Sequence, residues 1–464
     1  MMRQTSETSG RQEPKTICKQ LIVAENGANM HGELPSGAFV AEIGSEILFD
    51  PSGLDCYRVE GFEPRHYDLL VICAAIELAD RRWKRPQTWE RTLELSIPVF
   101  DLERWNRKGV QQALRTTLSM LTGDKWRFHF REAQSRKHIG SQQRQLTFNK
   151  QWKFAIAYSD GLDSRAVSAL CGSPEETLCI RVSGNKPKRA IGDSQFDRIP
   201  FKVQGSRGRE SSFRSRGFQF AAITAIAAHL AKIDQIVVPE SGQGALGPVL
   251  LPPHGVYRDY RNHPAFFRKM ETFLCALLDS HVRFEQPRLW STKAQTLGAF
   301  LKLPKREKAH LANTQSCWQR RSIVNVGHRK QCGLCAACLL RRLSLHAAGV
   351  SEPSDAYVVS DLSVGSVDEA LIGIASKVDR QTMIEYGAAG FRHFQHLAKM
   401  AQWDEGKIRV HVSEVAAALG ATKEETNRNL KKLLQQHASE WAAFITSQGE
   451  ESFLLNWMDG GLYV

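Results

Sequence analysis

A short polar segment, Ser159-Asp160-Gly161-Leu162-Asp163-Ser164, carries residue types that could bind a phosphate. It follows the apolar run 154–158, which predicts a buried strand, and it precedes apolar positions at helical spacing. Its first three residues form turns and let the main chain approach a ligand closely, while its second Asp and second Ser can cap a helix. A strand, a tight loop and a helix N-terminus together hold phosphates in many proteins, although an ordinary strand-to-helix turn has the same pattern.

Four cysteines far downstream could bind a metal ion: Cys317, Cys332, Cys335 and Cys338. The last three form two overlapping C-x-x-C turns, with a glycine inside the first turn. Four thiolates at this spacing predict a closed tetrahedral Zn²⁺ site. An iron–sulfur cluster also takes four cysteine ligands and stays open as an alternative. Buried free thiols fit the spacing poorly, and the lack of a secretory signal at the start of the chain disfavours a disulfide.

Together these features resemble the QueC family of 7-cyano-7-deazaguanine synthases, which are PP-loop ATP pyrophosphatases. The polar segment is similar to the PP-loop motif S-G-G-x-D-S, with Asp160 in place of a glycine. Residues 314–317 followed by 332–341 resemble the family's zinc signature. Two weaker matches lie between them in the correct order: residues 216–220 resemble R-N-x-x-F, and residues 292–295 resemble T-K-x-E with Gln295 in place of Glu.

The resemblance implies an ATP-dependent ligase that forms a C–N bond. A carboxylate of the 7-carboxy-7-deazaguanine type would attack the α-phosphorus of ATP and release pyrophosphate, and ammonia or a partner-protein amine would then displace AMP. Residues 159–164 would bind ATP, Asp163 and Asp160 would hold Mg²⁺, and Lys293 and Arg216 would offset the negative charge at phosphorus. The zinc would be structural, because four thiolates leave no open coordination position.

The chain departs from the family where the family binds its base. Here it lacks the Y-P-D-C-R pattern and reads Glu240-Ser241-Gly242-Gln243, which we expect to contact the substrate. The large flanking regions are foreign to the compact synthases and resemble the enlarged QatC-type proteins of bacterial antiphage defence. That likeness implies a deazaguanine-type carboxylate and a protein partner encoded in the same operon.

Residues 151–350 alternate short apolar runs with helical patterns, which predicts an α/β fold with a doubly wound parallel sheet. In such a fold the loops after the strands meet at one edge, where ligands bind. We expect a mobile tail over 1–35, an α+β accessory domain over 36–150 with a β-hairpin at Gly44-Ser45, and a mainly helical domain over 351–464. The basic stretch 186–216 predicts a solvated loop or a lid.

The 464 residues carry a formal net charge of +13, with 42% hydrophobic and 24% charged residues, as in soluble globular proteins. No apolar run approaches the ~20 residues that span a bilayer, so we expect a cytoplasmic protein that does not bind membranes. The positive charge fits a nucleotide or a nucleic acid equally well. Two alternative functions therefore stay open: a nucleic-acid-binding or tRNA-modifying PP-loop protein, and a scaffold whose nucleotide loop has decayed through Asp160.

Overall fold

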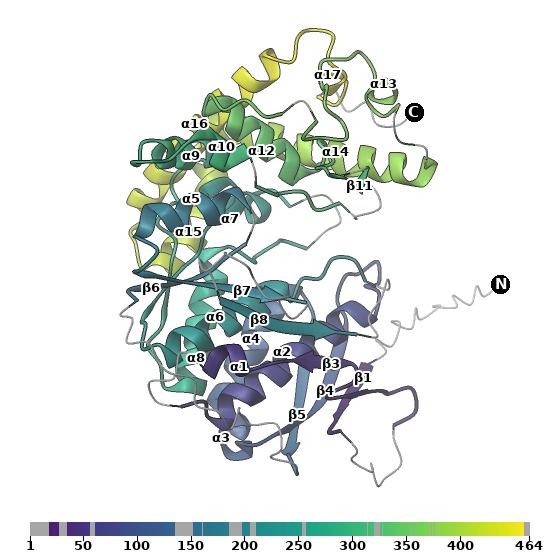
Figure 1. Cartoon of the computed structure of the whole chain (residues 1–464), viewed down its shortest axis with the longest axis vertical. Coiled ribbons are helices and arrows are strands. Elements are labelled where there is room, and N and C mark those ends of the chain that lie inside the picture. Colours follow the sequence, from purple (N-terminus) through teal and green to yellow (C-terminus); the bar gives the residue numbers. More distant parts are fainter. Residues whose placement is uncertain are drawn as a thin grey trace, which may run out of the picture.

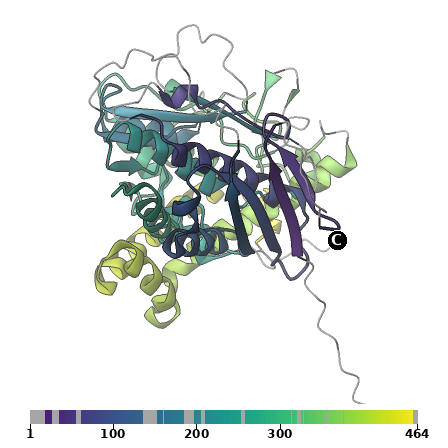
Figure 2. The ribbon, with the colours of Figure 1, turned by 90° about the horizontal axis from the view of Figure 1, so that it is seen from below.

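The structure is a computed structural model. Its elements form four successive layers (Figures 1 and 2): a small sheet, a helical layer, a larger sheet and a second group of helices. It describes residues 18–26, 35–55, 61–134, 152–159, 161–184, 197–204, 210–252, 257–312, 314–319, 325–326, 328–353, 355–372, 374 and 376–458.

The small sheet has four strands in the order β2-β1-β4-β5, and all neighbouring strands are parallel. Its strands are β1 (Cys18–Ala24), β2 (Phe39–Glu42), β4 (Thr92–Val99) and β5 (Lys125–Glu132). Two expectations need correction here. Strand β1 lies inside the segment that we expected to be a tail (1–35), because its apolar run is too short to show strand periodicity. The sheet is also wholly parallel, whereas we expected an α+β arrangement.

The large sheet has six strands in the order β10-β9-β6-β7-β8-β3, parallel except for the β3–β8 pair. Its strands are β3 (Ile47–Phe49), β6 (Phe154–Ala157), β7 (Thr177–Ser183), β8 (Asp197–Val203), β9 (Gln235–Val237) and β10 (Arg283–Glu285). The prediction of a mixed α/β fold with parallel strands is confirmed. The chain runs outward from β6 through β7 to β8 and then returns to β9 on the other side of β6.

The predicted hairpin at Gly44-Ser45 is wrong, because its two strands join different sheets. Strand β2 pairs with β1, and β3 pairs with β8 in the large sheet. Gly44 adopts a positive φ of 98° at this crossing, which a glycine tolerates. Strand β8 is a second correction, since it occupies the middle of the stretch that we expected to be a loop. The basic residues Lys186, Lys188, Arg189, Arg207 and Arg209 of that stretch lie outside the described residues.

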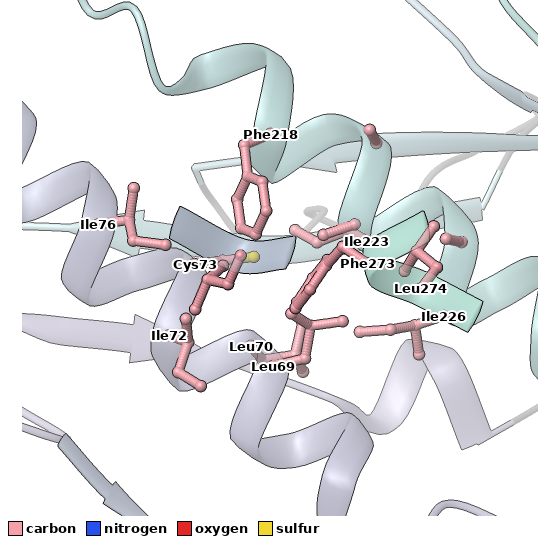
Figure 3. Packing of buried hydrophobic residues seen from close by; sticks show 14 of the residues in the cluster. Leu69, Leu70, Ile72, Cys73, Ile76, Phe218, Ile223, Ile226, Phe273 and Leu274 are labelled. Carbon is pink, nitrogen blue, oxygen red and sulfur yellow. The ribbon is translucent and has the colours of Figure 1, made fainter. Parts of the chain in front are cut away.

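The helices between the sheets are α2 (Pro64–Arg82), α4 (Lys108–Thr122), α6 (Arg216–Leu230) and α8 (Pro264–Leu278). Helices α2 and α6 are buried around most of their circumference, as expected for helices that are apolar on every side. Figure 3 shows the packing of Leu69, Leu70 and Cys73 from α2 against Phe218 of α6 and Phe273 of α8. The accessory region and the large sheet therefore share one hydrophobic core.

The opposite face of the large sheet is covered by α5 (Leu162–Cys171), and α9 packs on α5. Strand residues alternate between the two faces: Ile156 and Val237 pack with Val167 of α5, whereas Ala155 and Ile236 belong to the core around α6. The other helices of this half are α7 (Gly242–Leu250), α9 (Lys293–Leu301), α10 (Lys308–Ala312), α12 (Ala336–Ala347), α14 (Lys377–Lys399), α15 (Glu405–Leu419) and α16 (Lys423–Thr446).

The remaining elements are short: α1 (Ser52–Asp55), α3 (Leu102–Asn106), β11 (Asn325–Val326), β12 (His328–Arg329), α13 (Val367–Ala370), η1 (Met400–Gln402) and α17 (Phe453–Asn456). Helices α14 and α16 contact each other and α12, which follows the cysteine turns. Among the described residues, no helix has the length and apolar character needed to cross a lipid bilayer.

Candidate functional site

The candidate site lies where the order of the large sheet reverses, between β6 and β9. In open parallel sheets the loops that leave two such strands diverge to opposite sides, and the space between them accepts ligands. The loop after β6 leads into α5, and the loop after β9 leads into α7, so both helix N-termini lie at this edge. The N-terminus of α9 reaches the same place through Lys293.

The loop 159–164 is held by its two serines. The Ser159 amide donates to Ser164 Oγ at 3.1 Å, the two hydroxyl oxygens are 2.8 Å apart, and the Gly161 amide approaches Ser159 Oγ at 3.3 Å. Gly161 is the N-cap of α5, and the first-turn N–H groups that follow it have no intrahelical acceptor. Asp160 lies outside the described residues.

An ion pair between Asp163 and Lys293 forms the charged centre of the site. Lys293 Nζ contacts Asp163 Oδ2, and Ser241 Oγ donates to Asp163 Oδ1 at 2.9 Å. The side chains of Asp163 and Lys293 are 13% and 10% exposed, so the pair is largely buried but keeps some contact with solvent. Burial lowers the pKa of Lys293, but Asp163 and Glu240 outweigh it and leave that pKa above the ordinary value.

Glu240 is a second carboxyl group beside this pair. It accepts hydrogen bonds from Asn262 Nδ2 at 2.9 Å and from the Ser241 amide at 3.2 Å. Burial and the nearby carboxylate of Asp163 raise the pKa of Glu240 to about 8. Gly244 permits this position, because a Cβ there would lie 2.6 Å from the Glu240 Cδ. The site can therefore hold a neutral carboxylic acid close to neutral pH.

Gly242 and Gln243 are placed differently from Glu240 and Ser241. A Cβ on Gly242 would lie 2.5 Å from Leu433 Cδ2, so the α7 backbone packs directly on α16. Gln243 is 2% exposed, and its amide bridges the Lys293 backbone and His437. These two residues therefore pack against α16, whereas Ser241, which is equally buried, contacts Asp163 directly.

Arg216 starts α6, on the other face of the sheet from α5. Its guanidinium lies over the Phe220 ring at 5.1 Å, and the side chain is exposed. Among the described residues, no hydrogen bond or ion pair joins Arg216 to Asp163 or Lys293. Its neighbour Gly217, which stands where the R-N-x-x-F motif has asparagine, lies against Arg261: a Cβ there would lie 3.1 Å from the Arg261 Cγ.

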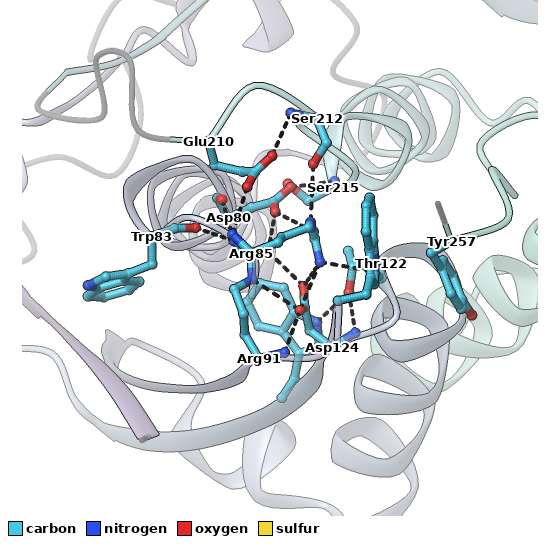
Figure 4. Close-up of polar contacts among 12 residues, drawn as sticks. Asp80, Trp83, Arg85, Arg91, Thr122, Asp124, Glu210, Ser212, Ser215 and Tyr257 are labelled. Atoms are coloured by element: carbon cyan, nitrogen blue, oxygen red, sulfur yellow. Dashed lines mark hydrogen bonds and ion pairs between the residues drawn. The ribbon is translucent and has the colours of Figure 1, made fainter. Parts of the chain in front are cut away.

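The start of α6 is fixed by a buried ion network that the sequence did not reveal (Figure 4). Arg85 and Arg91 both bind Asp80 and Asp124, at 2.6–2.9 Å, and both carboxylate side chains are fully buried. The Ser215 amide donates to Asp80 Oδ2 at 2.8 Å, immediately before α6. Asp80 lies only 5 and 11 residues from its two arginine partners, but Asp124 lies 39 residues from Arg85 and Ser215 lies 135 residues from Asp80. Local spacing could not have predicted these two distant contacts.

The start of α9 accommodates a glutamine at position 295, where the T-K-x-E motif has glutamate. Thr292 and Gln295 form a capping box: Gln295 N donates to Thr292 Oγ1 at 3.1 Å, and Thr292 N donates to Gln295 Oε1 at 3.0 Å. An amide oxygen accepts this bond as a carboxylate would. Thr296 contributes to the site too, since its hydroxyl is 3.2 Å from Ser241 Oγ. Its i+3 spacing from Lys293 could have predicted this shared face.

The four cysteines meet at one point, with their sulfur atoms all within 4.8 Å of one another. A tetrahedral ion with Zn–S bonds of about 2.3 Å places its ligands roughly 3.8 Å apart, and Cys332 Sγ and Cys338 Sγ are 3.7 Å apart. The Cys332 amide donates to Cys317 Sγ and the Cys335 amide to Cys332 Sγ, both at 3.3 Å. This set fits a tetrahedral ion, and such amide bonds stabilise thiolates.

The cysteine turns are connected to the loop 159–164 through Arg341. This fully buried side chain binds Glu352 at 2.8 Å and the Thr314 carbonyl at 3.1 Å. Thr314 precedes Gln315, whose carbonyl would lie 3.7 Å from a Cβ on Gly161. The segment 314–315, which Arg341 contacts and which immediately precedes Cys317 in the sequence, therefore borders the loop 159–164.

Comparison with known families gives one finding about this region. The family model described as "Queuosine biosynthesis protein QueC" matches residues 254–349. Searches of curated proteins and of solved structures found no match. The matched segment includes Asn262, Lys293 and the four cysteines, but it begins well after the loop 159–164 and covers less than half of the chain. The chain thus carries a QueC-like segment, which supports an ATP-utilising enzyme of the PP-loop type.

Proposed function

We propose that the protein activates a carboxylate with ATP and then joins it to an amine. The observation that carries the proposal is the meeting of Asp163, Ser241 and Lys293, from three separate helix N-termini, at the sheet's switch point. Helix N-termini favour anions, and the Lys293 ammonium adds a positive charge beside them. This is the charge distribution that a polyphosphate requires.

In the proposed reaction an oxygen of the carboxylate attacks the α-phosphorus of ATP, and the bond to the β-phosphate oxygen breaks. Pyrophosphate leaves, and a nitrogen then attacks the acyl carbon, with AMP as the leaving group. Catalysis of such steps depends mainly on positioning and charge stabilisation. The first-turn amides of α5 would bind the pyrophosphate oxygens, and Lys293 would stabilise the charge that develops at phosphorus.

Asp163 is the residue that would bring Mg²⁺ to the phosphates, where the ion would neutralise their charge. When ATP is present, the phosphates can replace Asp163 as the anionic partner of Lys293. Glu240 and Ser241 border the same space and are our proposed substrate contacts, whereas Gly242 and Gln243 support the backbone behind them. Arg216 lies on the other face of the sheet from α5, so it could contribute to the reaction only by contacting a ligand that extends across the edge of the sheet.

The deazaguanine type of the carboxylate and a protein amine as acceptor rest on the resemblance of the motifs and on the QueC-like segment. We propose both as the first substrates to test, together with a role in antiphage defence. The four-cysteine site would hold a structural Zn²⁺, because the four sulfur ligands fill a tetrahedral shell.

The test is product analysis with the full chain, ATP, Mg²⁺ and ammonium, with and without 7-carboxy-7-deazaguanine. We expect AMP and pyrophosphate in equal amounts, with faster release when the carboxylate is present. ADP and phosphate as products would contradict adenylation. Unchanged ATP together with tight, salt-sensitive RNA binding would favour a nucleic-acid function instead.

A further inference from the structure

Helix α16 crosses the site's rear wall and contacts the N-termini of both α7 and α9. Leu433 packs on the backbone of Gly242 in α7. His437 lies about one turn after Leu433 and is fully buried, and Glu440 lies about two turns after Leu433 and is 6% exposed. Each of these two polar side chains makes a hydrogen bond to a residue that holds Lys293 in place.

The first contact is a directional relay that ends on the Lys293 backbone. His437 Nε2 lies 3.0 Å from the Phe394 carbonyl, which can only accept, so this nitrogen carries the hydrogen. The other ring nitrogen then accepts from Gln243 Nε2 at 3.0 Å. This fixes the Gln243 amide so that its oxygen accepts from the Lys293 amide at 2.7 Å. Every group in the relay has one allowed orientation.

The second contact acts on the preceding residue. Thr292 Oγ1 donates to Glu440 Oε1 at 2.7 Å while accepting from the Gln295 amide within the capping box. Burial raises the pKa of Glu440 above its ordinary value, and the bond from Thr292 opposes that rise. The cap of α9 is thus anchored to α16 one residue before the site lysine.

We infer that His437 and Glu440 are positioning residues for Lys293, and that the C-terminal helices form part of the active site. The inference rests on the proposed function for its catalytic consequence, but the relay itself is a structural claim. Displacing a reacting group by about 1 Å can cost on the order of 100-fold in rate, even when the change lies far from the chemistry. A backbone shift at the start of α9 would move Lys293 relative to Asp163 by such an amount.

The test compares His437→Phe and Glu440→Leu, which remove the polar contacts, with Glu440→Gln, which keeps an acceptor for Thr292. His396→Phe, the same change at an exposed position of α14, is the matched control. Hydrogen exchange followed by mass spectrometry reports the protection of the Lys293 amide. We expect exchange there to accelerate at least tenfold in His437→Phe and Glu440→Leu, and to match wild type in Glu440→Gln and His396→Phe.

Turnover provides the second readout. The two disruptive variants should lose about 10- to 100-fold in kcat for pyrophosphate release, with the KM for ATP changed less than threefold, because the lysine is displaced and the phosphate loop is intact. If His437→Phe fails to fold, Glu440→Leu carries the test. Wild-type exchange rates in a folded Glu440→Leu variant would overturn the inference. An inactive wild-type protein would defeat the proposed function alone, since the exchange comparison would still decide the positioning role.

Discussion

Glu240 is a carboxyl group of the candidate site whose pKa is raised far above its ordinary value. It lies beside Asp163 and within reach of Asn262 and the Ser241 amide, and its pKa is raised to about 8. The folded chain therefore keeps a proton that the unfolded chain releases near the ordinary glutamate value of 4.5. Between these two values, folding stability falls as the pH rises, because the native state binds more protons than the unfolded state.

Replacing Glu240 with glutamine removes this titration. We compare the unfolding free energy of Glu240→Gln with that of wild type. The variant's value minus the wild-type value should increase by on the order of 1–3 kcal/mol as the pH rises from about 5 to about 8. Denaturant unfolding at several pH values measures the difference. Glu424→Gln, at an exposed position of α16, should show no comparable trend. A constant difference between Glu240→Gln and wild type across this range would show that Glu240 titrates normally.

At the scale of elements, the close approach of α7 to α16 and to the loop before α9 depends on Gly242. A side chain there would collide with Leu433 and with the Leu289 carbonyl. Ser241, which contacts Asp163, is the residue immediately before this glycine. The packing around the site thus includes a close contact of the Gly242 backbone, which leaves no room for a side chain at this position.

We expect Gly242→Ala to lower the unfolding free energy by about 1–3 kcal/mol through overpacking. Gly298→Ala in α9 is the matched control, because a Cβ there meets nothing within 4 Å. It should be neutral or stabilising by up to about 1 kcal/mol, since alanine favours helix. Thermal or denaturant unfolding distinguishes the two. Equal stability of both variants would mean that α7 moves away from α16 at little cost.

At the scale of the whole molecule, the four-cysteine site connects the regions that build the candidate site. The cysteines belong to the same buried cluster as Phe391 of α14 and Trp441 of α16. Arg341, three residues after Cys338, reaches the segment beside Gly161. A metal ion at the cysteines would therefore stabilise both the loop 159–164 and the α16 contacts.

Metal analysis should find about one zinc ion per chain, as a single four-thiolate site requires. Cys338→Ser should lower that content and the melting temperature, because binding of a structural metal contributes directly to folding. Cys275→Ser, at an exposed position of α8, should change neither. Strong visible absorption with bound iron would instead indicate an iron–sulfur cluster.

Much of the large sheet could be predicted from sequence because its strands are short apolar runs followed by helical patterns. Strand β6 was predicted to within one residue, since the apolar run 154–158 indicated it. Asp163 and Lys293 were expected to act in the same site, and they lie in contact. The pairing of β3 with β8 was not predicted. These strands have three and seven residues and lie far apart in the sequence, so nothing in either segment indicates which strand it pairs with.

The C-terminal contacts to the site could not be predicted for a related reason. His437 and Glu440 lie on a helix whose sequence pattern shows only that one face is buried. Their partners Gln243 and Thr292 lie about 150 to 200 residues earlier in the chain. Spacing within an element identifies its faces, but the choice of a distant partner depends on the packing of the whole chain.

The most direct test of the central claim is exchange of labelled pyrophosphate into ATP, which occurs only if the first step is a reversible adenylation. With 7-carboxy-7-deazaguanine and Mg²⁺ present, we expect wild type to exchange label and Lys293→Met to lose at least 100-fold. Lys302→Met, at the exposed end of the same helix, should match wild type. Exchange at the wild-type rate in a folded Lys293→Met variant would contradict the site that we assign.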